Sequence, residues 1–108
     1  MAVFFIEANN TWQQVGEGIT RQVTGYNNDL MMVKVAFEKG AVGTLHHHVH
    51  TQASYVASGV FEVEVDGVKQ VLRAGDTFFV APNFVHGVVC LEAGLLVDVF
   101  NPHREDFL

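Results

Sequence analysis

The sequence predicts an all-β protein, built as an antiparallel sandwich or a small barrel. Short apolar runs recur along the chain with turn residues between them. Asp66-Gly67 separates two segments of alternating polarity, which is a strong hairpin signal. No long stretch has a helical period, and residues 103–108 have room for one helical turn. Small antiparallel barrels of this type can hold a ligand inside.

Each expected strand is bounded by residues that favour turns. The first apolar run ends at Glu38-Lys39-Gly40, and the second ends at Ser58-Gly59. The third alternates valine and phenylalanine with glutamate up to Asp66-Gly67, and the fourth resumes the alternation until the turn at Arg73–Asp76. A short apolar run follows, and Glu92-Ala93-Gly94 separates the last two. We therefore expect strands at 30–37, 52–57, 60–65, 68–72, 77–81, 85–91 and 95–100.

Length and composition limit the class of protein. At 108 residues, with 49% apolar residues, the chain is expected to form one domain, 1–108, with its own core. A formal charge of −6 without a cluster of lysine or arginine disfavours nucleic acid as a partner. A single cysteine, Cys90, suits a reducing compartment. No signal-peptide pattern and no apolar run of about 18 residues is seen, so we expect a cytoplasmic protein without membrane contact.

Histidines and glycines recur at spacings that suggest a metal site. The first block reads Gly40-x5-His46-x-His48-x3-Gln52-x6-Gly59, and the second reads Gly75-x6-Pro82-x3-His86. Residues two apart on a strand point the same way, so His46 and His48 are expected to project together. Three imidazoles and an amide oxygen suit one divalent ion such as Zn, Ni, Fe, Co or Mn.

The register of the histidine run His46-His47-His48-Val49-His50 follows from its neighbours. A shift to His48 and His50 would put Val42 at the glycine position and Ser54 at the ligand position. His47 is then expected to face solvent, while His50 is left as a neighbour of the ligands, a substrate contact or a surface residue.

Gln52 would be a neutral ligand, so the ion would keep its full charge and favour an anionic substrate. The same neutrality argues against an oxygenase with two histidines and one carboxylate.

The run 95–100 contains one acid, Asp98, in an apolar strand. A buried carboxylate needs a partner or a raised pKa, so Asp98 is either tied to a backbone amide or an arginine, or acts as a catalytic acid or base. Phe100 shares its parity and would line the same cavity or fill the core. Arg104 would either be solvated or hold a substrate carboxylate by a two-point contact.

The two histidine blocks form the two-part signature of a cupin, and nearly the whole chain resembles small single-domain cupins of the KdgF, or pectin degradation protein, family. The likeness rests on residues 37–43, 45–59, 82–94 and 98–108, and the ending Arg104-Glu-Asp-Phe-Leu108 is its most telling part. It implies a cupin (RmlC-like) fold, an antiparallel double-stranded β-helix or jelly-roll barrel. The chain departs from the general cupin pattern at Gln52, where glutamate is common, and at Phe84, where glycine is common.

The resemblance also implies an activity, the isomerisation of 4,5-unsaturated monouronates from pectin or alginate breakdown to linear keto acids. One divalent transition-metal ion would be bound, and Asp98, Phe100 and Arg104 would serve the substrate, a small anionic sugar acid. The metal ligands would be His46, His48, Gln52 and His86. A homodimer is expected, because small cupins commonly pair their sheets and the apolar residues 3–6 need a partner surface.

Two other classes of function stay open. One is a different metal-dependent cupin enzyme, such as an isomerase of another substrate or a dioxygenase acting on a small acid. The other is a non-catalytic module that binds sugar acids. Asp98 and Arg104 together favour an enzyme, since simple binding does not require both.

Overall fold

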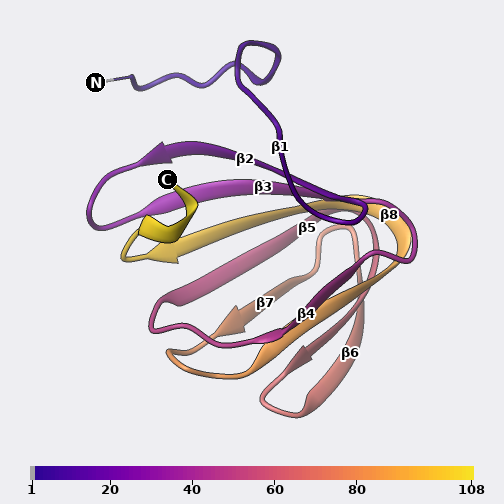
Figure 1. The fold of residues 1–108 in the computed structure, drawn as a ribbon. Coiled ribbons are helices and arrows are strands. Elements are labelled where there is room, and N and C mark those ends of the chain that lie inside the picture. Colours follow the sequence, from indigo (N-terminus) through magenta and orange to yellow (C-terminus); the bar gives the residue numbers. More distant parts are fainter. Residues whose placement is uncertain (1) are drawn as a thin grey trace.

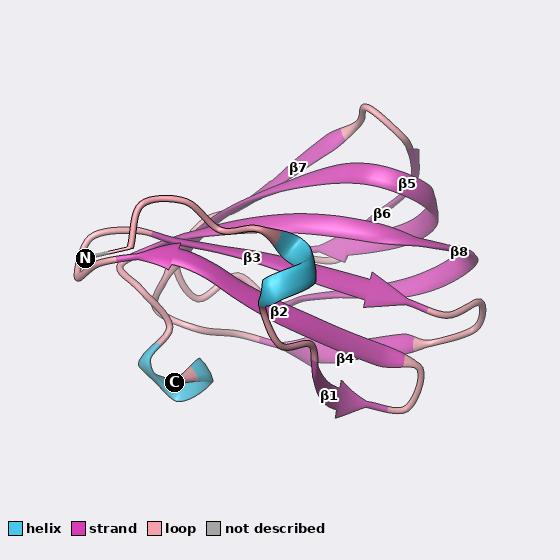
Figure 2. Cartoon of the chain, turned by 90° about the horizontal axis from the view of Figure 1, so that it is seen from above, coloured by secondary structure: helices cyan, strands magenta, loops and turns pink. Residues whose placement is uncertain are grey.

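Antiparallel strands make up most of the computed structural model, which describes residues 2–108. Within this range there are eight strands and two short 3-10 helices, arranged as a sheet that curls over on itself (Figure 1, Figure 2). The elements are η1 (Glu7–Asn9), β1 (Gln13–Gly16), β2 (Ile19–Tyr26), β3 (Met31–Phe37), β4 (Val42–His46), β5 (Thr51–Val65), β6 (Val68–Arg73), β7 (Thr77–Val80), β8 (His86–Asn101) and η2 (Glu105–Phe107). The all-β antiparallel prediction is confirmed.

Two long central strands, β5 and β8, organise the sheet. They pair with each other along most of their length. The early part of β8 also pairs with β4 and its later part with β3, while the early part of β5 pairs with β7 and its later part with β6. The main strand order is β1-β2-β3-β8-β5-β6. Because each long strand changes partner midway, the sheet folds into two facing halves, as Figure 1 shows.

The sequence prediction was wrong about two turns. Ser58-Gly59 and Glu92-Ala93-Gly94 were expected to end strands, but they lie inside β5 and β8, where the register shifts between Val56 and Phe61. The two strands approach so closely here that a Cβ on Gly59 would lie 2.6 Å from the carbonyl oxygen of Glu92. Gly59 also has a φ of +82°, which a side chain would disfavour. These glycines therefore bend continuous strands rather than end them.

Three strands, β1, β2 and β4, were not predicted. Four of the eight residues of β2 are threonine, arginine or glutamine, and β1 and β4 are short, so their apolar alternation is weak. They are strands because neighbouring strands offer them partners: β1 pairs with β2, β2 also pairs with β3, and β4 pairs with β8. The expected helical turn near the C-terminus is confirmed as η2.

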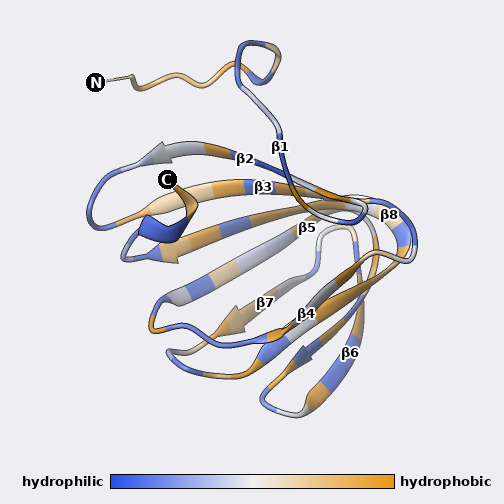
Figure 3. Ribbon diagram, in the orientation of Figure 1, coloured by the Kyte–Doolittle hydropathy of each residue, from blue (hydrophilic) through white to orange (hydrophobic). Residues whose placement is uncertain are grey.

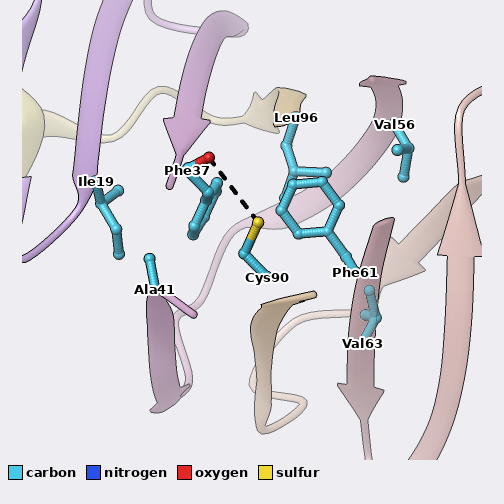
Figure 4. Packing of buried hydrophobic residues seen from close by; sticks show 8 residues of the cluster. All are labelled: Ile19, Phe37, Ala41, Val56, Phe61, Val63, Cys90 and Leu96. Carbon is cyan, nitrogen blue, oxygen red and sulfur yellow. Dashed lines mark hydrogen bonds between the residues drawn. The ribbon is translucent and has the colours of Figure 1, made fainter. Parts of the chain in front are cut away.

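The core is made of alternate side chains that face the inside of the curled sheet, and apolar and polar residues alternate along the strands in Figure 3. Its larger cluster is centred on Phe37 and Phe61, whose rings meet edge to face at 5.2 Å (Figure 4). Cys90 belongs to this cluster, and burial raises the pKa of its thiol, which disfavours the reactive thiolate form. A second cluster contains Met31, Val33 and Phe100. None of the helices described is long and apolar enough to cross a membrane.

Candidate metal centre and substrate pocket

Three of the predicted ligands meet at one point. His46 ends β4 and His86 begins β8, and the two residues are paired in register. His48 lies two residues beyond β4, so the loop before β5, and not the alternation of a strand, brings its ring to the site. One ring nitrogen from each of the three histidines lies within 4.8 Å of the others. The three residues could therefore hold a metal ion.

The hydrogen bonds of the three rings assign their protons. Each Nδ1 lies close to a backbone carbonyl oxygen two residues away, at 2.8 Å for His46, 3.1 Å for His48 and 2.9 Å for His86. A carbonyl oxygen only accepts, so Nδ1 carries the hydrogen and Nε2 keeps its lone pair. The Nε2 of His86 is buried and has no partner among residues 2–108. Burial lowers the pKa of His86 to about 4 and also lowers that of His48, which keeps both rings in the neutral form that binds metals.

Gln52, the fourth predicted ligand, is oriented by a chain of hydrogen bonds. The hydroxyl of Ser54 donates to Oδ1 of Asp98 at 2.6 Å, so it accepts from Nε2 of Gln52 at 2.9 Å. The amide oxygen Oε1 of Gln52 then faces Nε2 of His48 at 3.0 Å. Two acceptors at this separation repel unless a cation lies near both. The donor set therefore fits a divalent ion, and Gln52 as a ligand remains a prediction.

The other two histidines of the run lie outside this cluster. His47 is exposed, as its opposite parity predicted. The Nε2 of His50 lies 3.2 Å from the carbonyl oxygen of His103, and its ring is 6.4 Å from that of Phe100. His50 does not line the cavity described next, so the structure adds no support for its predicted contact with substrate.

A cavity of about 200 Å³ opens beside the histidines. Typical pockets for drug-sized molecules measure about 300–1,000 Å³, so this one suits a single sugar ring rather than an oligosaccharide. Much of its wall is apolar, with Ile19, Val35, Phe37 and Leu96 among the lining residues. The predicted site residues that line it are His46, Gln52, His86, Asp98, Phe100 and Arg104.

Asp98 lies on the inner face of β8, opposite Ser54 of β5. Burial raises the pKa of its carboxyl to about 6, although the hydrogen bond from Ser54 and the charge of Arg104 favour the ionised form. If Asp98 had only a structural role, the sequence analysis expected its partner to be a backbone amide or an arginine. The direct partner in the structure is instead the hydroxyl of Ser54. The sequence analysis missed Ser54, and its parity with Gln52 was the signal that could have found it.

Two arginines reach the same cavity. Arg104 donates to the carboxylate of Asp106 through Nε at 3.0 Å and Nη2 at 2.9 Å, which holds the pKa of Asp106 below its usual range. Its guanidinium also lies 5.1 Å from the ring of Phe100 and 4.3 Å from that of Phe107. Arg21 of β2 lines the cavity as well. It was missed because β2 was not predicted, although it stands between Ile19 and Val23 in an alternating pattern.

Comparison with known proteins agrees with this geometry. The family model for the cupin domain matches residues 33–100. The pectin degradation protein KdgF of Dickeya dadantii (strain 3937) is 47% identical over 110 residues, which cover 100% of both chains. The chain belongs to the KdgF family of cupins.

Solved structures of similar cupins share the whole fold. An RmlC-like cupin from Shewanella frigidimarina NCIMB 400 is 48% identical, with a TM-score of 0.97 over 100% of this chain and 97% of its own. KdgF from Halomonas sp. is 44% identical, with a TM-score of 0.95 over 100% of both chains. The predicted RmlC-like cupin fold is therefore confirmed.

Proposed function

We propose that this cupin is a metal-dependent enzyme that converts 4,5-unsaturated monouronates from pectin or alginate breakdown into linear keto acids. The observation that carries the proposal is the chain Asp98–Ser54–Gln52, which joins a carboxyl of raised pKa to the histidine cluster. Both ends of this chain line a cavity of single-sugar size. The 47% identity to a protein named for pectin degradation supports the same substrate class.

The reaction would be an isomerisation. The substrate is a cyclic enol ether with a carboxylate, and opening of its hemiacetal releases an enol. The enol becomes a ketone when carbon 4 takes up a proton. No atom is gained or lost, so the enzyme has to move protons and stabilise negative charge without an oxidant or a second substrate.

The residues of the site offer these functions. A divalent ion held by His46, His48, His86 and Gln52 would supply electrostatic stabilisation of negative charge on a substrate oxygen. Asp98 would exchange a proton with the substrate, because its pKa of about 6 lies near neutral pH, where such transfer is most effective.

The remaining contacts would hold the substrate. Phe100, which meets the ring of His48 at 5.8 Å, would pack against the sugar ring. Arg104 would bind the anionic group with the donors that Asp106 leaves available.

The direct test is to mix the metal-loaded protein with an unsaturated monouronate made by a pectin or alginate lyase. We expect loss of the ultraviolet absorbance of the double bond and appearance of a ketone signal by NMR, and neither in protein treated with a chelator. Binding without loss of absorbance would indicate a sugar-acid binding module instead. Oxygen consumption with bound Fe would indicate a dioxygenase.

A further inference from the structure

Arg21 is a charged side chain in the pocket that the proposed mechanism does not use. It lies on β2 with the same parity as Ile19, and both residues line the cavity that Asp98 and Arg104 also line. Its guanidinium carbon is 3.8 Å from the centre of the Phe107 ring. Phe107 belongs to η2, the C-terminal turn that lies beside the ends of β2 and β3 in Figure 1. The β2 strand and the C-terminus thus meet at this arginine.

The hydrogen-bonding capacity of Arg21 is largely unused. Its Nε is buried and has no hydrogen-bond partner among residues 2–108. Its Nη2 donates one long bond, 3.3 Å, to the amide oxygen of the exposed Gln13. Within the described chain, Arg21 forms no ion pair with a carboxylate. A partly buried guanidinium in this state favours an added anion, because burial without a partner is costly for a charged group.

Arg104 provides the contrast. Two of its nitrogens already bind the carboxylate of Asp106, so its charge is compensated inside the protein. Burial lowers the pKa of Arg21, and the positive charge of Arg104 lowers it further. The negative charge of Asp106 acts on Arg21 at longer range and partly offsets both effects. A guanidinium keeps its proton even so, because its ordinary pKa lies far above neutral pH. Arg21 is therefore the pocket arginine whose charge lacks a direct partner in the described chain.

Contact with Phe107 also prepares Arg21 for binding. A guanidinium packed on an aromatic ring loses little freedom when it binds an anion, because the ring already restricts its position. The guanidinium carbons of Arg21 and Arg104 lie 3.8 Å and 4.3 Å from the centre of the Phe107 ring, so this ring restricts the positions of both side chains.

We infer that Arg21 binds the carboxylate of the sugar-acid ligand and thereby makes the pocket selective for the acid over a neutral sugar of the same shape. This rests on the proposed function for the identity of the ligand. Arg104 is then the assisting contact, whose remaining donors reach the same anion or a neighbouring oxygen. Arg21 is a specificity-determining residue in this view.

The test uses a saturated monouronate, galacturonate, and its methyl ester, which keeps the ring and removes the charge. Calorimetry with the metal-loaded protein measures Kd for both ligands in wild type, Arg21→Met, Arg21→Lys and Arg73→Met. Arg73 is exposed on β6 and controls for the loss of one positive charge. Arg21→Met should raise Kd for the acid about 10- to 100-fold, the range of a charge-assisted hydrogen bond, and that for the ester less than about threefold. The Kd of Arg21→Lys for the acid should lie between those of wild type and Arg21→Met. Arg73→Met should have the Kd values of wild type.

An equal change in Kd for the acid and the ester in Arg21→Met, or no change in either Kd, would overturn the inference. So would a wild-type protein that does not bind the acid more tightly than the ester. Arg21→Lys keeps the charge and gives a second reading should Arg21→Met fail to fold. Selectivity for the acid below that of wild type would support a two-point contact, and selectivity equal to that of wild type would count against it. None of these readings needs turnover, so failure of the ultraviolet assay would remove the proposed reaction without deciding the role of Arg21.

Discussion

Ser54 donates a 2.6 Å hydrogen bond to Oδ1 of Asp98 across the paired strands β5 and β8. The same hydroxyl accepts from Gln52 at 2.9 Å. One side chain thus orients a predicted metal ligand and favours the ionised form of the acid. Ser54 is 3% exposed, so water does not easily replace it.

Ser54→Ala should affect both neighbours of the hydroxyl. Loss of the donor should raise the pKa of Asp98 above about 6 and move the matching limb of the pH–rate profile upward. Loss of the bond that orients Gln52 should weaken metal affinity roughly 10- to 100-fold, measured by competition with a chelating dye. Ser58→Ala, at an exposed position on the same strand, is the control. An unaltered metal affinity in Ser54→Ala would contradict the role of Ser54 in orienting a metal ligand.

Asp98→Asn should reduce turnover of the unsaturated monouronate by roughly 10²–10⁴, the usual contribution of general acid–base catalysis. Metal content should stay near that of wild type, because Asp98 contacts Ser54 and not the histidines. Asp66→Asn is a matched control, since asparagine before Gly67 suits the same hairpin turn. Turnover at the wild-type rate in Asp98→Asn would leave Asp98 with a structural role alone.

Asp98 should also shape the pH dependence of stability in the metal-free protein. Its pKa is about 6 in the folded state against an ordinary 3.8, so its ionisation costs stability as pH rises from about 4 to 6. His86, with a pKa lowered to about 4, has the opposite effect over a similar range. Asp98→Asn removes only the first effect.

The free energy of unfolding of Asp98→Asn minus that of wild type should therefore increase between pH 4 and pH 6. We expect an increase of roughly 1–2 kcal/mol, since one pKa unit corresponds to about 1.4 kcal/mol and solvent screening reduces it. Denaturant titrations of both chelator-treated proteins at several pH values measure this difference. A difference that does not vary with pH would contradict the raised pKa.

The metal site can be tested without activity. His46→Ala and His86→Ala should lose most of the bound ion by elemental analysis while the circular dichroism spectrum stays that of wild type. His47→Ala should keep the ion, because His47 is exposed and outside the cluster. Full occupancy in both of the first two variants would mean that other residues bind the metal.

We further propose that the chain is a homodimer. The N-terminal arm leaves the body of the fold in Figure 1, and its residues Val3, Phe4 and Ile6 are 60–85% exposed. Tyr55 and Phe79 expose a further apolar area on the outer face of the sheet. A second copy would cover this surface.

Light scattering at micromolar concentration should give twice the mass of one chain. Phe4→Asp should shift the protein towards monomer, whereas Val68→Asp, at an exposed position in the β6 hairpin, should not. A monomeric wild type would contradict the proposal.

Sequence alone predicted the histidine cluster, because the spacing of residues along the chain was enough to suggest it. The spacing of His46, His48 and His86 among glycines predicted a site that the structure brings together within 4.8 Å. The apolar runs and the Asp66-Gly67 turn likewise predicted the antiparallel fold class, since alternation along a strand reports directly which face is buried.

Tertiary structure decided the features that depend on approach between distant segments. Gly59 and Gly94 were expected at strand ends, and only the close approach of the paired strands β5 and β8 shows that they are bends where no Cβ fits. Arg21 was missed because β2 is a strand only through its pairing with neighbouring strands. Ser54 was missed because its hydrogen-bond partner, Asp98, lies 44 residues away in the sequence. Hydrogen bonds and burial of this kind arise from packing, which residue spacing does not encode.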